Sequence, residues 1–475
     1  MVRRDFLKAS AIGAAGIMMP AGLVSASAAP AVAPKKSANG KITMGFIGLG
    51  QQAMYLLSGF MSMDDVRVVA GCDVYDIKRD RFVNRVTKYY QGKGEKKVKV
   101  DVYEDYQDVL ARPDIDAVVI AVPDHQHAII AIAACKAGKD VYLEKPLTLT
   151  IYEGQQLVKA VRKYNRILQV GSQQRSSDEF FHAATLAREG ELGKIQKVKV
   201  FVGRNDVNPV TGAPMPCKLP HMEVPAGLNW DKWLGPLPTS VYYHSDLDPI
   251  VTNEENEKLW GAWRWYKVTG GGLMTDWGAH MFDIAQWALG KDGSGPVEII
   301  PPGYSFYDSL TYKYDNGVIV SEEPFDGTTP GVKIYGEDGW IQVSRGKFSA
   351  SDKKFDMKKA AADDDVPYET KVGHHRKFIE AIKSRIDPNV PVEVGHSSCT
   401  VCNLGNIAME LGRPVVWNPI VQKFSMIRRL PSLCTTSTVR LTSTPWMYSI
   451  PPGKKEKRRP EWAPFSFCGE SEIMT

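Results

Sequence analysis

The sequence has few cysteines, no excess of one charge in its central part, and no long apolar run after its first 28 residues. Seven cysteines among 475 residues are an odd number without the spacing of a disulfide framework, so disulfides do not define this fold. With 43% hydrophobic and 24% charged residues, the composition excludes a disordered chain and a collagen-like repeat. The length predicts two domains that fold unaided.

The net charge of +5 comes from the two ends of the chain. Residues 1–28 carry three Lys/Arg and one Asp, and residues 425–475 carry eight Lys/Arg and four Glu. The remainder holds 48 basic and 49 acidic residues, which leaves no basic excess to attract nucleic acid. We therefore expect no nucleic-acid partner.

The first 28 residues have the organisation of an export signal. Arg3 and Arg4 form a twin-arginine pattern, a weakly apolar run extends from Ala9 to Leu23, and Ala26-Ser27-Ala28 fits a cleavage site. The run is too short to span a bilayer comfortably, because a span needs about 20 apolar residues. These features predict export by the twin-arginine pathway to the periplasm or beyond, with no membrane span after signal removal. Residues 29–40 read as a flexible linker.

Residues 41–171 alternate between strand-like and helix-like segments. Apolar runs predict strands at Ile42–Ile47, Val66–Cys72, Ala117–Val122, Val141–Leu143 and Ile167–Val170. Amphipathic stretches such as Ile151–Tyr164 lie between them. Strands that alternate with helices of this length are typical of βαβ units, so we predict an α/β Rossmann domain with a parallel sheet.

The turn after the first strand has the pattern G-x-G-x-x-A. Gly48 permits a tight turn, Gly50 lets the backbone approach a pyrophosphate, and Ala53 lets the following helix pack closely on the strand. Gln51 and Gln52 begin that helix, whose N-terminus offers N–H groups and a partial positive charge to phosphates. We expect these five residues to bind a dinucleotide. The alternative is that the glycines serve only the turn.

Asp73 ends the second predicted strand, 20 residues after Ala53, where a carboxylate would hold the ribose diol of adenosine. A carboxylate repels a 2′-phosphate, so this position favours NAD over NADP. Lys78 and Arg79 lie close by in the sequence and keep NADP open as the alternative.

Three later loops follow the carboxyl ends of strands, and such loops face the ligand crevice of a parallel sheet. On this ground we assign cofactor binding to Asp124, His127, Glu144, Lys145 and Gln174. For His127, a capping or packing role is the alternative. The ammonium of Lys145 would also polarise a hydroxyl or carbonyl and stabilise a developing alkoxide.

In the second half, Gly270–Gly272 precede a predicted helix at Leu273–Leu289. An apolar stripe on that helix is flanked, about 100° away, by a stripe of Asp276, His280 and Asp283. One His and two Asp are a poor metal-ligand set by themselves, so we expect no metal. A structural hydrogen-bonded stripe remains open beside acid–base chemistry, in which Asp276 would hold the tautomer and position of His280.

Taken together with the glycine turn and Asp73, the Glu144-Lys145-Pro146 tripeptide and the Asp276-x-x-x-His280 pattern resemble the Gfo/Idh/MocA family of oxidoreductases. The resemblance covers about residues 41–424. It implies that a substrate domain at residues 172–424, of α+β class with a large, open, mostly antiparallel sheet, follows the Rossmann domain. It also implies that Lys145, Asp276 and His280 are catalytic and that copies associate through the open sheet.

Several residues are predicted on weaker patterns. As substrate contacts we name Arg175, Arg264, Tyr266, Asp283 and His375, with packing as the alternative for His375. Trp230, Trp233 and Trp260 are predicted to be core. Cys399 and Cys402 have a redox-like spacing but lie on a helix-like stretch, which predicts a buried helix face.

The family-like sequence ends at about Phe424, and a Ser/Thr-rich run and a charge cluster follow. We hypothesise a frameshift in the source gene and predict disorder over residues 425–475; resequencing that finds no single-base insertion or deletion would exclude the frameshift.

These patterns predict an exported NAD(P)-dependent oxidoreductase that transfers hydride between a hydroxyl or keto group of a sugar and a tightly bound nicotinamide. The first alternative is an NAD-dependent glycoside hydrolase, which acts by oxidation, elimination, water addition and re-reduction. The resemblance implies that N-acetylgalactosaminidases of that kind lack a lysine at the position of Lys145. The second alternative, a non-catalytic sugar or nucleotide sensor, has no need of a proton relay.

Overall fold

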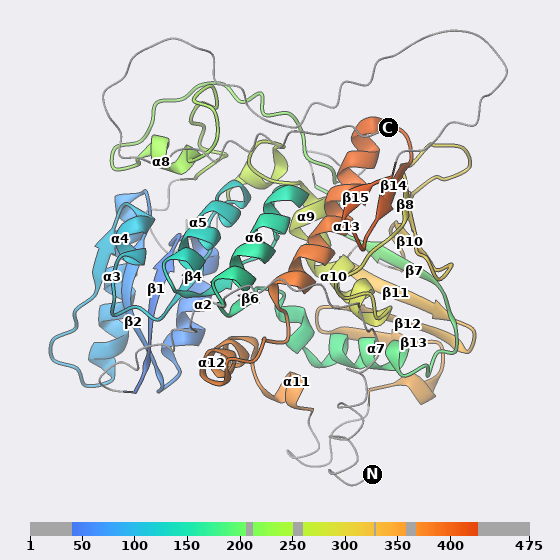
Figure 1. The fold of residues 1–475 in the computed structure, drawn as a ribbon, viewed down its shortest axis with the longest axis horizontal. Coiled ribbons are helices and arrows are strands. Elements are labelled where there is room, and N and C mark those ends of the chain that lie inside the picture. The colour runs from blue at the N-terminus through green and yellow to red at the C-terminus, as the bar shows by residue number, and fades with distance from the viewer. Residues whose placement is uncertain (1–39, 206–211, 250–259, 327–328, 358–366, 426–475) are drawn as a thin grey trace, which may run out of the picture. The chain divides into compact units, whose positions relative to one another are not determined.

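The first half of the chain forms a six-stranded, fully parallel sheet in the order β3-β2-β1-β4-β5-β6 (Figure 1). Its strands are β1 (Ile42–Ile47), β2 (Val66–Cys72), β3 (Asp101–Tyr103), β4 (Ala117–Ile120), β5 (Asp140–Leu143) and β6 (Leu168–Val170). The order reverses between β1 and β4, and ligands bind outside the strand ends at such a switch point. The computed structural model describes residues 40–205, 212–249, 260–326, 329–357 and 367–425.

Sequence reasoning missed β3. The strand is three residues long, lies at the edge of the sheet, and has no fully buried residue, so it leaves no apolar run to detect. The predicted signal peptide and nearly all of the predicted linker and tail lie outside the described residues.

Helices cover both faces of the parallel sheet. They are α2 (Gln51–Met61), α3 (Asp76–Gly92), α4 (Tyr106–Leu110), α5 (Asp124–Lys136) and α6 (Ile151–Lys163). The start of α6 is fixed by a capping box: the Glu153 N–H donates to Oγ1 of Thr150 over 3.2 Å, and the Thr150 N–H donates to Oε2 of Glu153 over 2.9 Å. Two apolar cores, one on each face, hold the sheet between these helices.

The second sheet has nine strands in the order β13-β12-β11-β7-β10-β9-β8-β14-β15, and only β7 and β10 pair in parallel. Its strands are β7 (Ile195–Phe201), β8 (Glu298–Ile300), β9 (Leu310–Lys313), β10 (Ile319–Glu322), β11 (Gly331–Gly336), β12 (Gly339–Ser344), β13 (Lys347–Ala350), β14 (Val415–Asn418) and β15 (Lys423–Phe424). Val198 and Val200 of β7 enter the apolar core, whereas Lys197 and Lys199 face the other way and pair with Glu323. The sheet confirms the predicted fold class of the second half.

Three helices pack on one face of the nine-stranded sheet: α7 (Asp178–Arg188), α10 (Gly278–Ala288) and α13 (Val392–Leu411) (Figure 1). The helix predicted at Leu273–Leu289 is divided at Trp277 into α9 (Leu273–Asp276) and α10. Cys399 and Cys402 are buried in α13, as predicted. Within the described ranges, no helix combines the length and apolar character of a membrane span.

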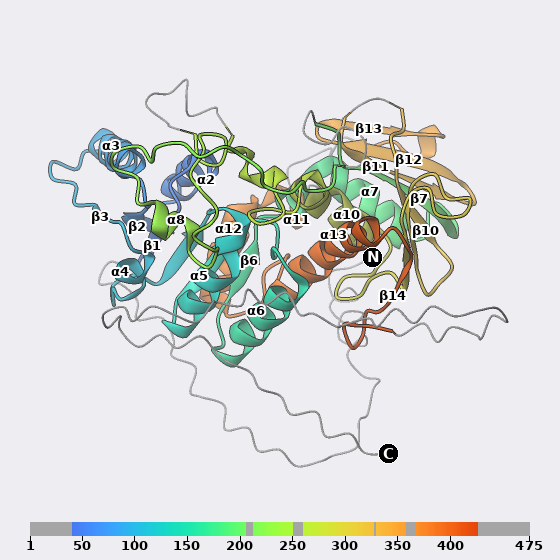
Figure 2. The ribbon, with the colours of Figure 1, turned by 90° about the horizontal axis from the view of Figure 1, so that it is seen from above.

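Two segments of the second half lie against the first. α12 (His374–Ser384) places Phe378, Ile379 and Ile382 in the apolar core beside β1 and α2. α8 (Trp230–Leu234) lies beside the end of β2 (Figure 2), where the Asn229 N–H donates to the Val74 carbonyl. The other short helices are α11 (Tyr368–Lys371) and the 3₁₀ turns Gln173–Ser176, Ala262–Trp265 and Lys353–Phe355.

Candidate active site

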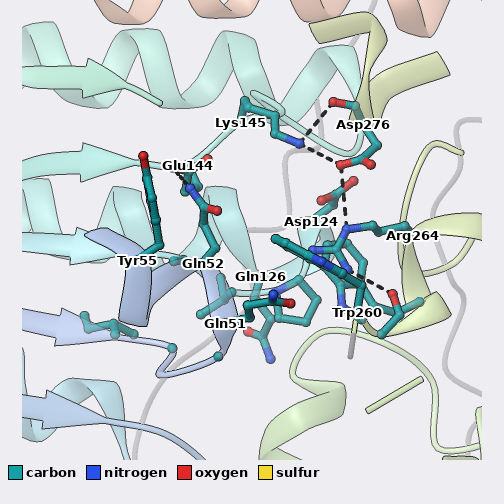
Figure 3. Close-up of a pocket in the computed structure, with 18 of the residues that line it drawn as sticks. Gln51, Gln52, Tyr55, Asp124, Gln126, Glu144, Lys145, Trp260, Arg264 and Asp276 are labelled. Atoms are coloured by element: carbon teal, nitrogen blue, oxygen red, sulfur yellow. Dashed lines mark hydrogen bonds and ion pairs between the residues drawn. The ribbon is translucent and has the colours of Figure 1, made fainter. Parts of the chain in front are cut away.

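A cavity of about 1350 Å³ opens at the carboxyl ends of the parallel strands. One wall comes from the loops that follow β1, β2, β4 and β5, and the opposite wall comes from α9, α10 and the loops of the second half (Figure 3). Of the predicted site residues, those that line the cavity are Gly48, Gly50, Gln51, Gln52, Asp73, Asp124, Glu144, Lys145, Gln174, Arg264, Asp276, His280 and His375.

The glycine turn is shaped to bring backbone close to a ligand. Gly48 has a φ of +80°, and a Cβ there would lie 2.4 Å from the Ala121 carbonyl oxygen, so a side chain is excluded. At Gly50 a Cβ would meet no atom within 4 Å, because this residue borders the cavity. The helix α2 begins directly after it and aims its first N–H groups at the same space. This cradle fits a pyrophosphate.

Asp73 is fixed by backbone on both of its oxygens. The Leu49 N–H donates to Oδ2 over 2.7 Å, and the Tyr75 N–H donates to Oδ1 over 3.0 Å. The carboxylate is therefore held beside the glycine turn and lines the cavity, as an adenosine-ribose acceptor requires.

At the other end of the cavity, Lys145 and Asp276 form an ion pair (Figure 3). Nζ of Lys145 lies 2.6 Å from Oδ1 of Asp276 and 3.0 Å from its backbone oxygen. Nε of Arg264 lies 3.6 Å from the same Oδ1. Burial raises the pKa of Asp276, but the charges of Lys145 and Arg264 outweigh burial and bring the pKa to about 2. The carboxylate is ionised at any working pH.

His280 lies in the same cavity without the partner that the sequence suggested. It is only 5% exposed, and its Nδ1 has no hydrogen-bond partner among the described residues. Burial, reinforced by the charge of Lys145, holds the pKa of His280 well below its ordinary value, so the ring is a neutral imidazole. The prediction that Asp276 orients His280 is corrected: Asp276 bonds Lys145, because the break at Trp277 directs its side chain toward the loop after β5.

Buried polar groups line the space between these two ends. Oε1 of Glu144 accepts hydrogen bonds from Gln52 over 2.9 Å and from Gln173 over 3.0 Å. Burial, together with the charge of Asp276, raises the pKa of Asp124 to about 8. Neither amide atom of Gln174 has a partner among the described residues, although its side chain is 4% exposed. Unpaired polar atoms of this kind indicate a site built for a polar ligand.

Five predicted site residues do not line the cavity. One of them, Ala53, is fully buried where it lets α2 pack, as the motif requires. Arg175 and Asp283 form a buried ion pair instead, with Nε of Arg175 2.7 Å from Oδ2 of Asp283. The side chain of Asp283 is directed toward Arg175, in the turn after β6, and does not reach the cavity. Tyr266 packs in a small apolar cluster with Trp263.

His127 is the remaining predicted site residue that does not line the cavity. Its two ring nitrogens lie 2.8 Å from the Pro146 oxygen and 2.9 Å from the Val122 oxygen, so it joins the loops after β4 and β5 rather than touching a cofactor. No group of three His, Cys, Asp or Glu side chains within the described ranges is arranged to hold a metal.

Sequence reasoning missed an aromatic and cationic wall. Trp260, predicted as core, is 51% exposed and lines the cavity, and the Arg264 guanidinium lies over its ring at 4.7 Å. Arg345, in the turn between β12 and β13, lines the cavity 4.5 Å from the centre of the Trp277 ring. No local pattern marks Arg345, because an arginine in a hairpin turn is ordinary. Trp233 is buried as predicted and stacks on Trp230, yet one side of it borders the cavity.

The fold and the site define a dinucleotide-binding protein with a second, sheet-based half that covers the crevice. Two family models match the chain: "Oxidoreductase family, NAD-binding Rossmann fold" at residues 42–172 and "Oxidoreductase family, C-terminal alpha/beta domain" at residues 214–438. The chain belongs to the Gfo/Idh/MocA oxidoreductase family. The second match runs to residue 438, past Phe424, where we placed the end of the family-like sequence.

Among curated relatives, a glycosyl hydrolase family 109 protein of Shewanella putrefaciens is 30% identical over 205 residues, and an alpha-N-acetylgalactosaminidase of Shewanella oneidensis is 29% identical over 209. Each match spans 41% of this chain and 44% of the relative, which is less than half of its length.

Solved structures share the fold over most of the chain. The WlbA dehydrogenase of Bordetella pertussis, in complex with NADH and UDP-GlcNAcA, has a TM-score of 0.55 at 16% identity, covering 79% of this chain and 98% of that one. The aldose–aldose oxidoreductase of Caulobacter crescentus has a TM-score of 0.54 at 18% identity, covering 79% and 99%.

Proposed function

We propose that this protein is a nicotinamide-dependent oxidoreductase that acts on a hydroxyl or keto group of a sugar or sugar derivative. The observation that carries the proposal is the Lys145–Asp276 ion pair and the neutral His280, which share one cavity with the glycine turn. A bound nicotinamide supplies the hydride acceptor or donor. The donor to the substrate oxygen and the proton acceptor come from side chains of this chain.

We assign cofactor binding to residues at one end of the cavity and substrate chemistry to residues at the other end. The backbone at Gly50 and the start of α2 would hold the pyrophosphate, and Asp73 would hold the adenosine ribose. At the far end, Nζ of Lys145 donates a hydrogen bond to the substrate oxygen and stabilises it as an alkoxide. The neutral imidazole of His280 accepts the hydroxyl proton in the oxidative direction. Asp276 is a positioning residue that holds the ammonium of Lys145.

The cavity wall supports a carbohydrate substrate. Exposed Trp260 offers a flat apolar face, and Arg264 and Arg345 offer hydrogen-bond donors around it. Three cations, Lys145, Arg264 and Arg345, line the cavity, and the first two lie against the Asp276 carboxylate, which favours sugars that carry an anionic group.

An NAD-dependent glycoside hydrolase is the second candidate, since the curated relatives are named as a glycosyl hydrolase and an alpha-N-acetylgalactosaminidase. Lys145 favours the oxidoreductase, because the family resemblance implies that N-acetylgalactosaminidases of that kind lack a lysine at this position. One experiment distinguishes them. The purified protein is offered free neutral sugars, uronic acids and chromogenic glycosides while nicotinamide absorbance and fluorescence are followed. Oxidation or reduction of the nicotinamide by a free sugar supports our proposal; release of the chromophore without net nicotinamide reduction selects the hydrolase.

The same measurement addresses cofactor retention and the sensor alternative. We propose that the cofactor stays bound and is recycled by alternating substrates, as suits an exported enzyme with little free NAD around it. Protein that is purified without nicotinamide and binds it weakly contradicts this part, and sugar binding without any turnover would indicate a sensor.

We also propose that residues 1–28 direct export of the folded chain by the twin-arginine pathway. Replacing Arg3 and Arg4 together by lysine should leave the protein in the cytoplasm. Periplasmic accumulation of that variant at the original level would refute the pathway.

A further inference from the structure

A segment of the second half is joined by backbone to the loop that carries Asp73. The Asn229 N–H donates to the Val74 oxygen over 2.9 Å, and the Asp76 N–H donates to the Gly227 oxygen over 3.1 Å. Leu228 forms a bridge with Tyr75 between these two bonds. The adenosine side of the cavity is therefore built by both halves of the chain.

Within this joint, Lys78 and Asp248 form a buried ion pair. Nζ of Lys78 lies 2.6 Å from Oδ1 of Asp248, and the two residues are 8% and 6% exposed. Both line the cavity together with Asp73. Lys78 follows β2 in sequence, in the region where a nearby cation can accommodate a 2′-phosphate, but its ammonium is already paired with Asp248, 170 positions away.

The other oxygen of Asp248 is the second observation. Oδ2 is buried and has no hydrogen-bond partner among the described residues. A buried, unpartnered carboxylate oxygen costs free energy unless a ligand donates to it. A ribose hydroxyl has a proton to donate, whereas a 2′-phosphate is an anion that has none at neutral pH.

We propose that Asp248 completes the adenosine-ribose site and selects NAD against NADP. Together with Asp73 it places two carboxylates against the single ammonium of Lys78, so the site disfavours a phosphate dianion and accepts a free diol. The Arg79 guanidinium is engaged at the backbone, where its Nη1 donates to the Asp73 carbonyl oxygen over 2.6 Å. The inference rests on the cofactor part of the proposed function, but not on the choice of sugar.

The test is the affinity of the protein for NADH and NADPH, measured by fluorescence titration or calorimetry, with the tightly held nucleotide of each preparation identified by mass spectrometry after denaturation. Wild-type protein should prefer NADH by at least about tenfold. Asp248→Asn removes one charge and frees Lys78, so it should narrow the ratio of the two dissociation constants by about tenfold or more, as expected for loss of one charge-assisted contact.

Two further variants make the result specific. Asp248→Asn combined with Lys78→Met should lose the gain in NADPH affinity, because that gain depends on the freed ammonium. Asp246→Asn is the matched control in the same loop: its side chain is 51% exposed and does not line the cavity, and it should leave the ratio unchanged.

Three outcomes would overturn the inference. They are equal wild-type affinities for NADH and NADPH, an unchanged ratio in Asp248→Asn, and an equal loss of both affinities in that variant, which would make Asp248 merely structural. If Asp248→Asn does not fold, competition against the wild-type protein still tests the inference: adenosine 5′-phosphate should displace NADH, and adenosine 2′,5′-bisphosphate, which differs only by the added 2′-phosphate, should not. If no sugar reacts, the proposed function is contradicted, but the preference for NADH over NADPH can still be measured.

Discussion

The ammonium nitrogen of Lys145 lies 2.6 Å from Oδ1 of Asp276, and both side chains are 18% exposed. The contact joins the loop after β5 to α9, and therefore joins the nucleotide-binding sheet to the half that carries His280. Because Asp276 is paired with Lys145, the two groups to which we propose catalytic roles are an ammonium with a fixed position and a neutral imidazole without a carboxylate partner among the described residues.

Lys145→Met should remove the donor to the alkoxide while leaving the cofactor cradle intact. We expect kcat to fall by about 100- to 1000-fold, the usual loss for one such donor, with the NADH dissociation constant little changed. Steady-state kinetics and NADH titration measure the two effects. Lys163→Met, at an exposed position of α6, is the control. A Lys145 variant with nearly full activity would contradict the assignment.

The rate of sugar oxidation should persist at mildly acidic pH. The proposed reaction needs neutral His280, and burial holds the pKa of His280 well below the ordinary 6.5, so the proton-accepting form remains present below that pH. A pH profile of kcat measures this. Asp276→Asn removes a negative charge that raises the pKa of His280, so the acid limb of the profile should move to lower pH. The same variant should lower kcat, because Asp276 no longer holds the ammonium of Lys145 in position. Movement of that limb to higher pH would contradict the geometry.

Arg175→Met should destabilise the fold without weakening nucleotide binding. It leaves Asp283, which is 1% exposed, without its guanidinium partner, and breaking a buried pair costs about 3–5 kcal/mol. Urea unfolding measures the free energy of unfolding, and NADH titration measures the dissociation constant of the nucleotide. Arg162→Met breaks an exposed pair with Glu393 and should cost about 0–1 kcal/mol. Loss of sugar binding in folded Arg175→Met would restore the role predicted from sequence.

His127 should make the protein acid-sensitive. Burial lowers its pKa from 6.5 to about 4, so the folded state resists a proton that the unfolded state takes up. Its contribution is complete above pH 6.5 and is lost as pH falls toward 4; at about pH 5 the loss is about 2 kcal/mol. His127→Gln should reduce the difference in unfolding free energy between about pH 8 and pH 5 by that amount. The exposed His221→Gln should leave the difference unchanged.

The nucleotide half was predicted in most of its parts because its signals are local. A fully buried parallel strand such as β1 appears in the sequence as a continuous apolar run. The turn at Gly48 requires glycine, because a Cβ there would collide with the Ala121 carbonyl. Helical spacing placed Asp276, His280 and Asp283 in one stripe, but in the structure Asp276 and His280 line the cavity and Asp283 pairs with Arg175 outside it. Helical spacing did not predict the partners of these side chains. Spacing gives the direction of a side chain around the helix axis, but it does not identify the residues packed against that face.

The sequence by itself determined the strands of the first half other than β3, the glycine cradle, and the residue types available for chemistry. Tertiary structure alone decided which of them meet: Lys145 with Asp276 across 131 positions, Arg175 with Asp283 across 108, and Lys78 with Asp248 across 170. The physical reason is that a buried charge must find an opposite charge, and the nearest one in space is set by how two sheets and their loops pack, not by separation along the chain.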